Sequence, residues 1–277
     1  MCRIFPPLGS RLKKTYRNKY AGVGTTLRYR GLLFEVVLGE LLGDCLFFHQ
    51  LYEPYLESCL LNALHHASIF VDVGANIGIY SLLGAKLVDR VLSVEPSPTL
   101  RKRLIHNIQL NKIDNVTICD WAITDRDGDL SFYENLRSEN MEVGRIFHTG
   151  YPGESKVGIK VKGGTLDTLA FAYELFRSSC VIKIDIEGAE LRAINGGEEL
   201  LGGENAPILF IEIHPPEMTI FGGSNDALFK KLTELRYRIR DIVGFRDIDD
   251  DYLGRMDLFT VICTKSSHEK FINLKTK

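Results

Sequence analysis

The sequence lacks an uninterrupted apolar stretch long enough to cross a membrane. A spanning helix needs about 20 predominantly apolar residues, but the best candidate, GLLFEVVLGELLGDCLFF, is interrupted by Glu35, Glu40 and Asp44. The first residues also lack the continuous apolar core of a secretory signal. We therefore expect a cytoplasmic protein without a transmembrane segment.

Cysteine pairs with the C-x-x-C spacing of zinc sites are absent as well. The six cysteines are scattered, and several lie in apolar runs such as VTIC, CVIKI and LFTVIC. This placement is typical of reduced core residues. The sequence therefore predicts neither a zinc site nor a disulfide framework.

Acidic residues are missing from the first 34 positions, which carry eight basic residues. The whole chain has a formal net charge of −2, so residues 35–277 carry −10 (−2 − 8). We interpret residues 1–24 as a basic, disordered leader. Contact with a membrane surface, a nucleic acid or an acidic partner, and an organellar transit peptide, are the alternatives. Because an acidic body repels phosphates, we do not expect a nucleic-acid substrate.

What the sequence contains is an alternation of apolar strands with helical segments. The runs SIFVDV, VLSVE, VTIC, CVIKID and ILFIEIH are short and apolar, and helical patterns follow most of them. Strands of this kind form parallel sheets that helices cover on both faces. The last two strand candidates, YRIRDIVG and DLFTVICTK, are separated by a polar stretch, so we expect them to pair antiparallel at one edge.

This alternation divides the chain into four parts. After the leader, residues 25–66 contain the stretch from TTLRYRGLLFEVV to DCLFFHQ, which predicts a flap of two or three β-strands, and then a lead-in helix. Residues 67–265 form the main domain, and residues 266–277 form a tail. An insert at about 124–178 holds two predicted strands, DLSFYEN and KVGIKVKGG, and a predicted helix, TLDTLAFAYELF.

A glycine-containing turn follows the first strand of the main domain. In VDVGANIGIY, Asp72 ends the strand, and Gly74 and Gly78 follow in the order D-x-G-x-x-x-G. Ligands of open parallel sheets bind at the carboxyl ends of strands, where glycine lets the backbone approach them closely. The pattern differs from the G-x-G-x-x-G of dinucleotide sites. It suits a ligand with an amino group, and a turn shaped for geometry alone is the alternative.

Glu95 ends the next strand, 23 residues after Asp72. Nucleotide-binding α/β folds place a carboxylate at about this spacing, where it accepts hydrogen bonds from ribose hydroxyls. The alternative for Glu95 is a solvated or helix-capping acid before Pro96. The two motifs on consecutive strands predict a nucleoside-containing ligand.

The third strand ends in CDWAITDRDG, which offers contacts to a base. Asp120 suits an adenine amino group, and either Trp121 or Ala122 suits the face of the ring. A plain core aromatic is the alternative for Trp121.

Two further strand ends carry candidates for the chemistry. VIKIDIEGAE supplies Asp185 and Glu187, and ILFIEIHPP supplies Glu212 and His214 on one face of its strand. His214 beside carboxylates suits a general base for a hydroxyl. The set of Asp185, Glu212 and His214 also suits a divalent cation. The alternative is a structural role, in which the acids cap a helix and the histidine is only hydrogen-bonded.

These motifs together resemble the FkbM-type methyltransferases, a branch of the Rossmann-like S-adenosylmethionine-dependent enzymes. The resemblance runs from about residue 50 to 264 and rests on YEP, VDVGANIGIYS, VEPSP, VIKIDIEGAE and FIEIH. It implies an α/β class I methyltransferase fold, with a seven-stranded, mostly parallel sheet whose last strand is antiparallel. It also implies that the methionine portion of the cofactor is lined by Asp72, Gly74, Asn76 and Gly78, and that Glu95 binds its ribose.

The resemblance further implies a methyltransferase (EC 2.1.1 class) that methylates a hydroxyl on a sugar, a polyketide or another small molecule. Asp185, Glu212 and His214 are the catalytic candidates, and a divalent metal is not predicted. A non-catalytic binding protein on the same fold and a nicotinamide-dependent oxidoreductase are the alternative functions. Neither the acceptor nor the oligomeric state follows from the sequence.

Overall fold

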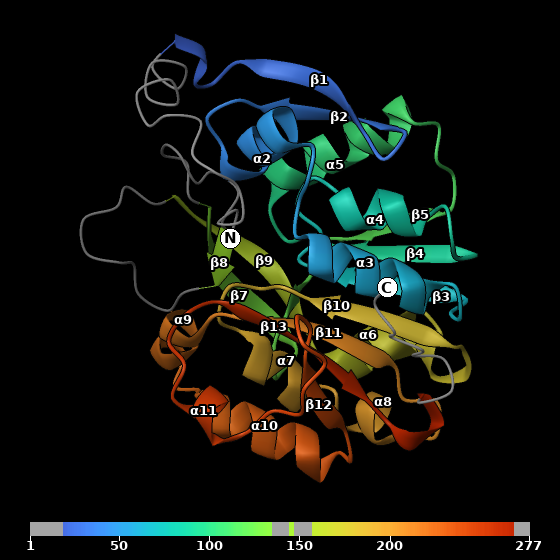
Figure 1. Cartoon of the computed structure of the whole chain (residues 1–277), viewed down its shortest axis with the longest axis vertical. Coiled ribbons are helices and arrows are strands. Elements are labelled where there is room, and N and C mark those ends of the chain that lie inside the picture. Colours follow the sequence, from blue (N-terminus) through green and yellow to red (C-terminus); the bar gives the residue numbers. More distant parts are fainter. Residues whose placement is uncertain (1–18, 135–143, 147–156, 269–277) are drawn as a thin grey trace.

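A seven-stranded sheet crosses the protein in the computed structural model, which describes residues 19–134, 144–146 and 157–268 (Figure 1). The strand order is β12-β13-β11-β10-β3-β4-β5. Neighbouring strands are parallel except at β13, which is antiparallel to both β11 and β12. The strands are β3 (Ile69–Val73), β4 (Arg90–Val94), β5 (Val116–Cys119), β10 (Cys180–Ile184), β11 (Ile208–Ile213), β12 (Arg238–Asp241) and β13 (Phe259–Thr264). This architecture confirms the predicted fold class.

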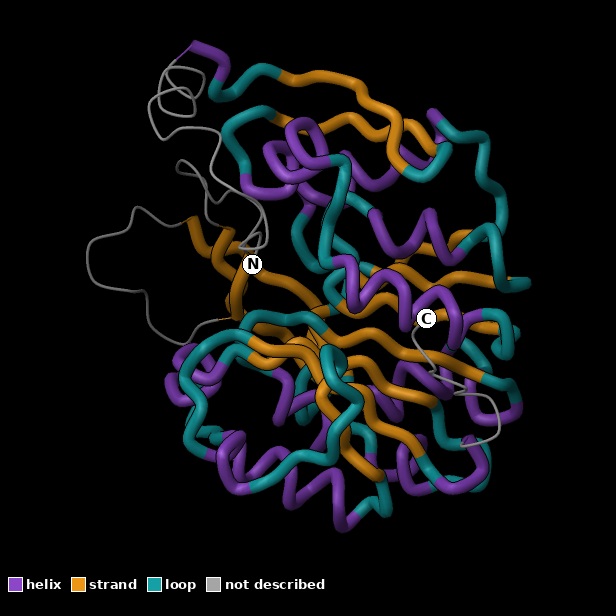
Figure 2. The backbone as a smooth tube through the Cα atoms, in the orientation of Figure 1, coloured by secondary structure: helices purple, strands orange, loops and turns teal. Residues whose placement is uncertain are grey.

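Helices cover both faces of this sheet, which explains why its central strands are apolar throughout (Figure 2). Phe70 and Phe210 pack toward α3 (Pro54–Leu64) and α4 (Ile79–Gly84). Val71 and Leu209 belong to the opposite core, which includes residues of α6 (Leu166–Ala172), α7 (Glu190–Asn195), α8 (Glu198–Gly202) and α10 (Asn225–Glu234). Two further helices, α9 (Pro215–Ile220) and α11 (Asp250–Leu253), follow β11 and β12.

The N-terminal extension differs in part from its prediction. It contains two antiparallel strands, β1 (Gly24–Tyr29) and β2 (Leu32–Val37), but DCLFFHQ belongs to a helix, α2 (Leu41–His49), and not to a third strand. Leu42, Cys45 and Leu46 are buried at helical spacing, a pattern that the apparent alternation concealed. Most of the predicted leader (1–24) and tail (266–277) lies outside the described residues.

Two asparagines join the extension to the main domain. Both lie on or just after α5 (Pro98–Leu110), which begins where Ser97 Oγ accepts a hydrogen bond from the Leu100 amide. Asn107 Oδ1 accepts from the amide of Glu35 at 2.8 Å. Asn111 accepts from the amide of Leu33 at 2.8 Å and donates to its carbonyl at 2.6 Å. Strand β2 therefore has its edge hydrogen-bonded to a helix of the main domain.

The insert forms a second, four-stranded sheet in the order β6-β9-β7-β8. Its strands are β6 (Ala122–Ile123), β7 (Gly128–Glu134), β8 (Gly144–Ile146) and β9 (Val157–Gly164), so DLSFYEN and KVGIKVKGG supply strands as predicted. The predicted helix TLDTLAFAYELF contains α6, followed by the short 3₁₀ helix η1 (Leu175–Arg177). A second 3₁₀ helix, η2 (Ser266–His268), ends the described part of the chain.

Four of the five cysteines in the described part of the chain are reduced. Cys59, Cys119, Cys180 and Cys263 are free and buried, as expected. Cys45 is disulfide-bonded, so the prediction is wrong at this position. The C-x-x-C criterion detects only close pairs, whereas disulfides also join cysteines that are distant in sequence. Among the described helices, none has the length and apolar character to span a bilayer.

The turn after β3 passes directly over the end of β10. Gly74 has φ +83°, and a Cβ built at this position would meet the carbonyl oxygen of Asp185 at 1.8 Å. The amide of Asp185 in turn donates to the carbonyl of Val73 at 3.0 Å. Only glycine fits here, because any side chain would push the two strand ends apart.

We expect Gly74→Ala to lower the free energy of unfolding by at least about 2 kcal/mol, since left-handed backbone alone costs other residues about 1–2 kcal/mol and the clash adds to it. Urea denaturation measures this change. The matched control is Gly202→Ala in α8, where the new Cβ would meet only Leu235 Cδ2 at 3.9 Å. Equal effects of the two substitutions would contradict the close approach.

Candidate active site

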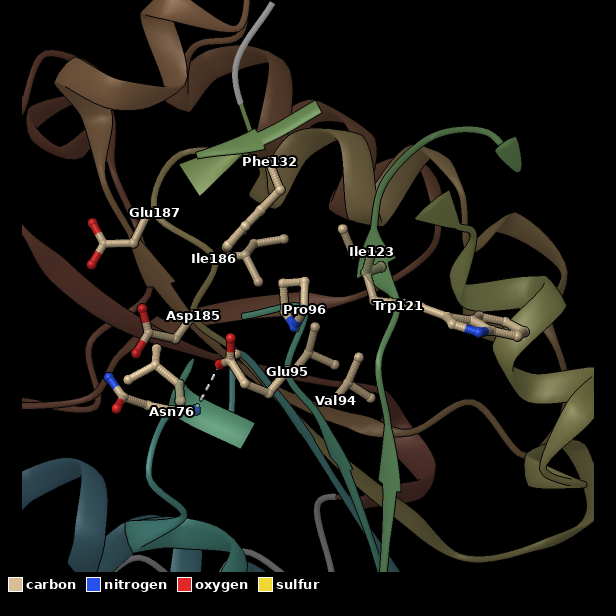
Figure 3. Close-up of a pocket in the computed structure, with 14 residues that line it drawn as sticks. Asn76, Val94, Glu95, Pro96, Trp121, Ile123, Phe132, Asp185, Ile186 and Glu187 are labelled. Atoms are coloured by element: carbon tan, nitrogen blue, oxygen red, sulfur yellow. Dashed lines mark hydrogen bonds between the residues drawn. The ribbon is translucent and has the colours of Figure 1, made fainter. Parts of the chain in front are cut away.

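The carboxyl ends of β3, β4 and β10 open into one cavity (Figure 3). The cavity measures about 570 Å³ including the space that is open to solvent. It lies at the edge of the sheet where ligands of parallel α/β folds bind. Its lining residues are Val73, Gly74, Asn76, Val94, Glu95, Pro96, Leu100, Trp121, Ala122, Ile123, Phe132, Asp185, Ile186 and Glu187.

Glu95 links the end of β4 to the glycine turn through hydrogen bonds. Its Oε2 accepts from the amide of Asn76 at 2.9 Å (Figure 3). Its Oε1 accepts from the amide of Ser97 at 2.8 Å. Burial raises the pKa of this carboxyl from 4.5 to about 7, although the two amides oppose the shift. A carboxylate has about four acceptor positions, so Glu95 can still accept hydrogen bonds from a ligand in the cavity.

The predicted residues of the glycine turn separate into lining and supporting positions. Gly74 and Asn76 line the cavity, whereas Asp72 and Gly78 do not. Asp72 is 1% exposed, and its Oδ2 accepts from Ser81 Oγ at 2.6 Å. Gly78 precedes α4 with φ +92°, and an added Cβ would meet Leu104 Cδ1 at 2.4 Å.

The segment that follows the third strand, β5, contributes its small residue, Ala122, to the cavity. Ala122 lines the cavity, whereas the indole of Trp121 points away from it (Figure 3). Lys162 Nζ lies 3.8 Å from the centroid of that indole, which fixes the ring against β9. Asp120 is exposed and is not part of the lining.

An apolar wall completes this half of the cavity and was not predicted from the sequence. Ile123, Phe132 and Ile186 face the same space (Figure 3). Phe132 comes from strand β7 of the insert and is 2% exposed. The length of the insert was the only sign in the sequence that it contributes to the cavity. The sequence does not show which residue of the insert lines it.

A buried lysine organises the other half of the site. Lys183 is 3% exposed in the middle of β10, and its Nζ lies 2.9 Å from Oδ2 of Asp185. Burial alone would lower the pKa of Lys183, but Asp185, Asp72 and Glu212 outweigh it and hold the pKa above its usual range. Burial would likewise raise the pKa of Asp185, but Lys183 and His214 hold it well below its usual range.

His214 lies among three carboxylates. Its Nε2 lies 3.4 Å from Asp185 Oδ1 and 3.7 Å from Glu212 Oε1, and its Nδ1 lies 3.2 Å from Glu187 Oε2. Burial would lower the pKa of the imidazole, but these acids together raise it to about 10. At neutral pH the ring is then protonated and has no free lone pair. The arrangement therefore suits His214 to position Asp185 as a charged group and not to act as a general base.

Two further residues of this half were missed as site residues. Tyr80 of α4 donates its hydroxyl hydrogen to Glu53 Oε2 at 2.7 Å, and Lys183 Nζ lies 5.2 Å from the Tyr80 ring centroid. Burial raises the pKa of Glu53, although Lys183 opposes the shift. Glu53 lies in YEP, which was noted only as part of a resemblance. The sign in the sequence that could have revealed them was Lys183, because a charged residue inside an apolar strand needs acidic or aromatic partners nearby.

The sequence matches the methyltransferase FkbM domain over residues 72–239, which is more than half of the chain. This protein belongs to the FkbM methyltransferase family. The match spans the glycine turn, Glu95, Lys183 and Asp185, so it confirms the predicted family. As an FkbM methyltransferase (EC 2.1.1 class), the protein uses S-adenosylmethionine as its methyl donor.

Solved structures similar to this FkbM methyltransferase share little sequence with it. Trm5b from Pyrococcus abyssi is 13% identical with a TM-score of 0.40, and the match covers 87% of this chain but only 54% of that one. TYW2 from M. jannaschii, in complex with AdoMet, is 14% identical with a TM-score of 0.41, covering 87% of this chain and 84% of that one. An rRNA methylase from Streptococcus thermophilus is 14% identical with a TM-score of 0.40, covering 78% and 98%. The comparison with curated proteins gives no match.

The raised pKa of Glu95 makes the stability of this FkbM methyltransferase depend on pH. The folded chain holds the proton more tightly than the unfolded chain, so this contribution is present below pH 4.5 and is lost as the pH rises through about 7. Glu95→Gln lacks it. We expect the variant to gain up to about 3 kcal/mol relative to the wild type between pH 5 and pH 8, as 2.5 pKa units correspond to about 3.4 kcal/mol.

Urea denaturation of both proteins across this pH range measures the difference. Contributions from other groups cancel, including Glu190, whose pKa burial also raises to about 7. A difference that stays constant from pH 5 to pH 8 would show that Glu95 titrates normally.

Proposed function

We propose that this methyltransferase transfers the methyl group of S-adenosylmethionine to a hydroxyl oxygen of a small molecule. The observation that carries the proposal is the position of Asp185, which lines the same cavity as the Glu95–Asn76 pair. One cavity thus combines groups suited to a nucleoside with a carboxylate suited to a hydroxyl.

The half of the cavity around Glu95 fits the cofactor. Glu95 would accept hydrogen bonds from the ribose hydroxyls, and Gly74 exposes backbone where the amino-acid portion would approach. The apolar wall of Ala122, Ile123 and Phe132 suits the adenine ring. Asp72 and Gly78 would act indirectly, by holding the turn in place.

The half around Lys183 fits the acceptor. When bound, the cofactor supplies a methyl group that is already electrophilic. The chain must then align the acceptor oxygen with it and receive the hydroxyl proton. Asp185 is suited to accept a hydrogen bond from the hydroxyl, because Lys183 keeps it ionised. His214 would hold Asp185 in position, and Glu212 would act on it indirectly through its own contact with His214.

Charge favours a small neutral acceptor over a nucleic acid. Asp185 and Glu187 both line the cavity, and residues 35–277 carry a formal charge of −10. Phosphates would be repelled at such a rim. The cellular location is part of the proposal: four free cysteines support the expected cytoplasm, whereas the disulfide at Cys45 argues against it.

Glu95→Gln should weaken binding of S-adenosylhomocysteine by roughly 10- to 150-fold, because hydrogen bonds to a charged group contribute about 1.5–3 kcal/mol. Isothermal titration calorimetry measures this affinity. Asp257→Asn is the control, since this exposed acid pairs with Arg255 at 2.6 Å, away from the cavity lining. Wild-type affinity in a folded Glu95→Gln protein would refute the ribose role.

Transfer of a labelled methyl group from S-adenosylmethionine to a metabolite extract tests the reaction itself. We expect mass spectrometry to find the label on an oxygen of a small molecule. His214→Ala should lower this transfer by about 100-fold, the scale of a misplacement of about 1 Å near the reacting groups, because it removes the contact that positions Asp185, while affinity for S-adenosylhomocysteine stays within about twofold. Label found only in RNA would contradict the acceptor class, and unchanged turnover in His214→Ala would exclude its role.

A further inference from the structure

Three potential metal ligands meet where β10 and β11 end. Asp185, Glu212 and His214 each offer one oxygen or nitrogen atom, and these atoms all lie within 4.8 Å of one another. The two strands are adjacent and parallel, with Ile184 opposite Ile211 in the register. The backbone of a buried sheet therefore sets the spacing of the three side chains.

The distances in this group are long for direct ion pairs. Charge-assisted N–H···O bonds are about 2.7–2.9 Å long, but His214 Nε2 lies 3.4 Å from Asp185 and 3.7 Å from Glu212. Ligands at about 2.0–2.2 Å from a shared cation lie about 3.0–3.5 Å apart at angles of 90–110°. The observed separations are closer to those of ligands around a cation than to those of a closed ion pair.

Glu212 provides an independent sign of a missing partner. Its side chain is buried, with the residue 6% exposed, and Oε2 has no hydrogen-bond partner among the described residues. The same holds for Nε2 of His214. A buried carboxylate oxygen without a partner is costly, and a bound cation would remove that cost.

The surrounding groups are arranged as supports for metal ligands. Lys183 contacts Oδ2 of Asp185, which leaves Oδ1 on the side of His214. Glu187 lies 3.2 Å from Nδ1 of His214, so Nδ1–H can donate to it while Nε2 faces the group. Metal-binding histidines are commonly oriented by such a carboxylate. Asp185, Glu187 and Glu212 outnumber the one lysine around His214, and a divalent cation would stabilise the ionised forms of these acids.

We infer that Asp185, Glu212 and His214 form a binding site for a divalent cation. Two carboxylates and one imidazole suit Mn²⁺ and related divalent ions, provided that the cation displaces the proton that His214 holds without it. Asp185 also lines the cavity, so the cation lies at the acceptor end. A cation held there would supply Lewis-acid chemistry, which lowers the pKa of a hydroxyl beside it. The site rests on these side chains alone and does not depend on the acceptor proposed above.

Mn²⁺ titrated into the metal-free, full-length protein tests this inference, with free Mn²⁺ followed by its electron paramagnetic resonance signal. No cofactor or acceptor is added, so the result is separate from methyl transfer. We expect one Mn²⁺ per chain. Glu212→Gln and His214→Ala should weaken binding by at least about 100-fold, because loss of an outer-shell partner alone costs about 10–100-fold.

The matched control is His106→Ala. His106 Nε2 also pairs with a carboxylate, Glu35, at 2.8 Å, but this pair is exposed on the surface. The control should bind Mn²⁺ like the wild type. Should Glu212→Gln fail to fold, Asp185→Asn takes its place, since Asp185 is less buried. A wild type that leaves the Mn²⁺ signal unchanged, or folded variants with wild-type affinity, would overturn the site.

Discussion

The chemistry of this protein depends on one buried ion pair, between Lys183 and Asp185. Lys183 lies in β10, between β3 and β11, and its pKa is raised by acids from all three strands. A buried ammonium is stable only with such partners, and the acids are stable only with the ammonium. The parallel strand order supplies both, because it brings the carboxyl ends of β3, β10 and β11 to the same edge of the sheet.

The pair also explains why the cavity has two different halves. Around Glu95 the polar contacts are backbone amides, and the remaining wall is apolar. Around Lys183 the contacts are between charged side chains. The first environment suits a large, mostly uncharged nucleoside, and the second suits a small polar group that must lose a proton. The two meet at Gly74, where the turn after β3 touches the end of β10.

The sequence was sufficient for features that depend on neighbouring residues along the chain. Strand and helix alternation predicted the sheet, and strand ends predicted Gly74, Glu95 and Asp185 in one place. Features that depend on distant contacts were missed. The indole of Trp121 points away from the cavity toward Lys162, and Phe132 returns to it from the insert. The three acids around His214 come from separate segments, so a pattern on one strand could not reveal its charge.

The hydrogen bonds of Asn107 make the N-terminal extension part of the folding unit. This fully buried side chain accepts from the amide of Glu35 and also donates to the carbonyl of Ile77 in the glycine turn, at 2.9 Å. The same core joins Phe34 and Val36 of the extension to Leu82 and Leu104 of the main domain. A fragment that began at residue 72, where the family match begins, would expose this core and remove one partner of Asn107. We therefore expect a stably folded form of this methyltransferase to include β1 and β2, which precede the residues matched by the family.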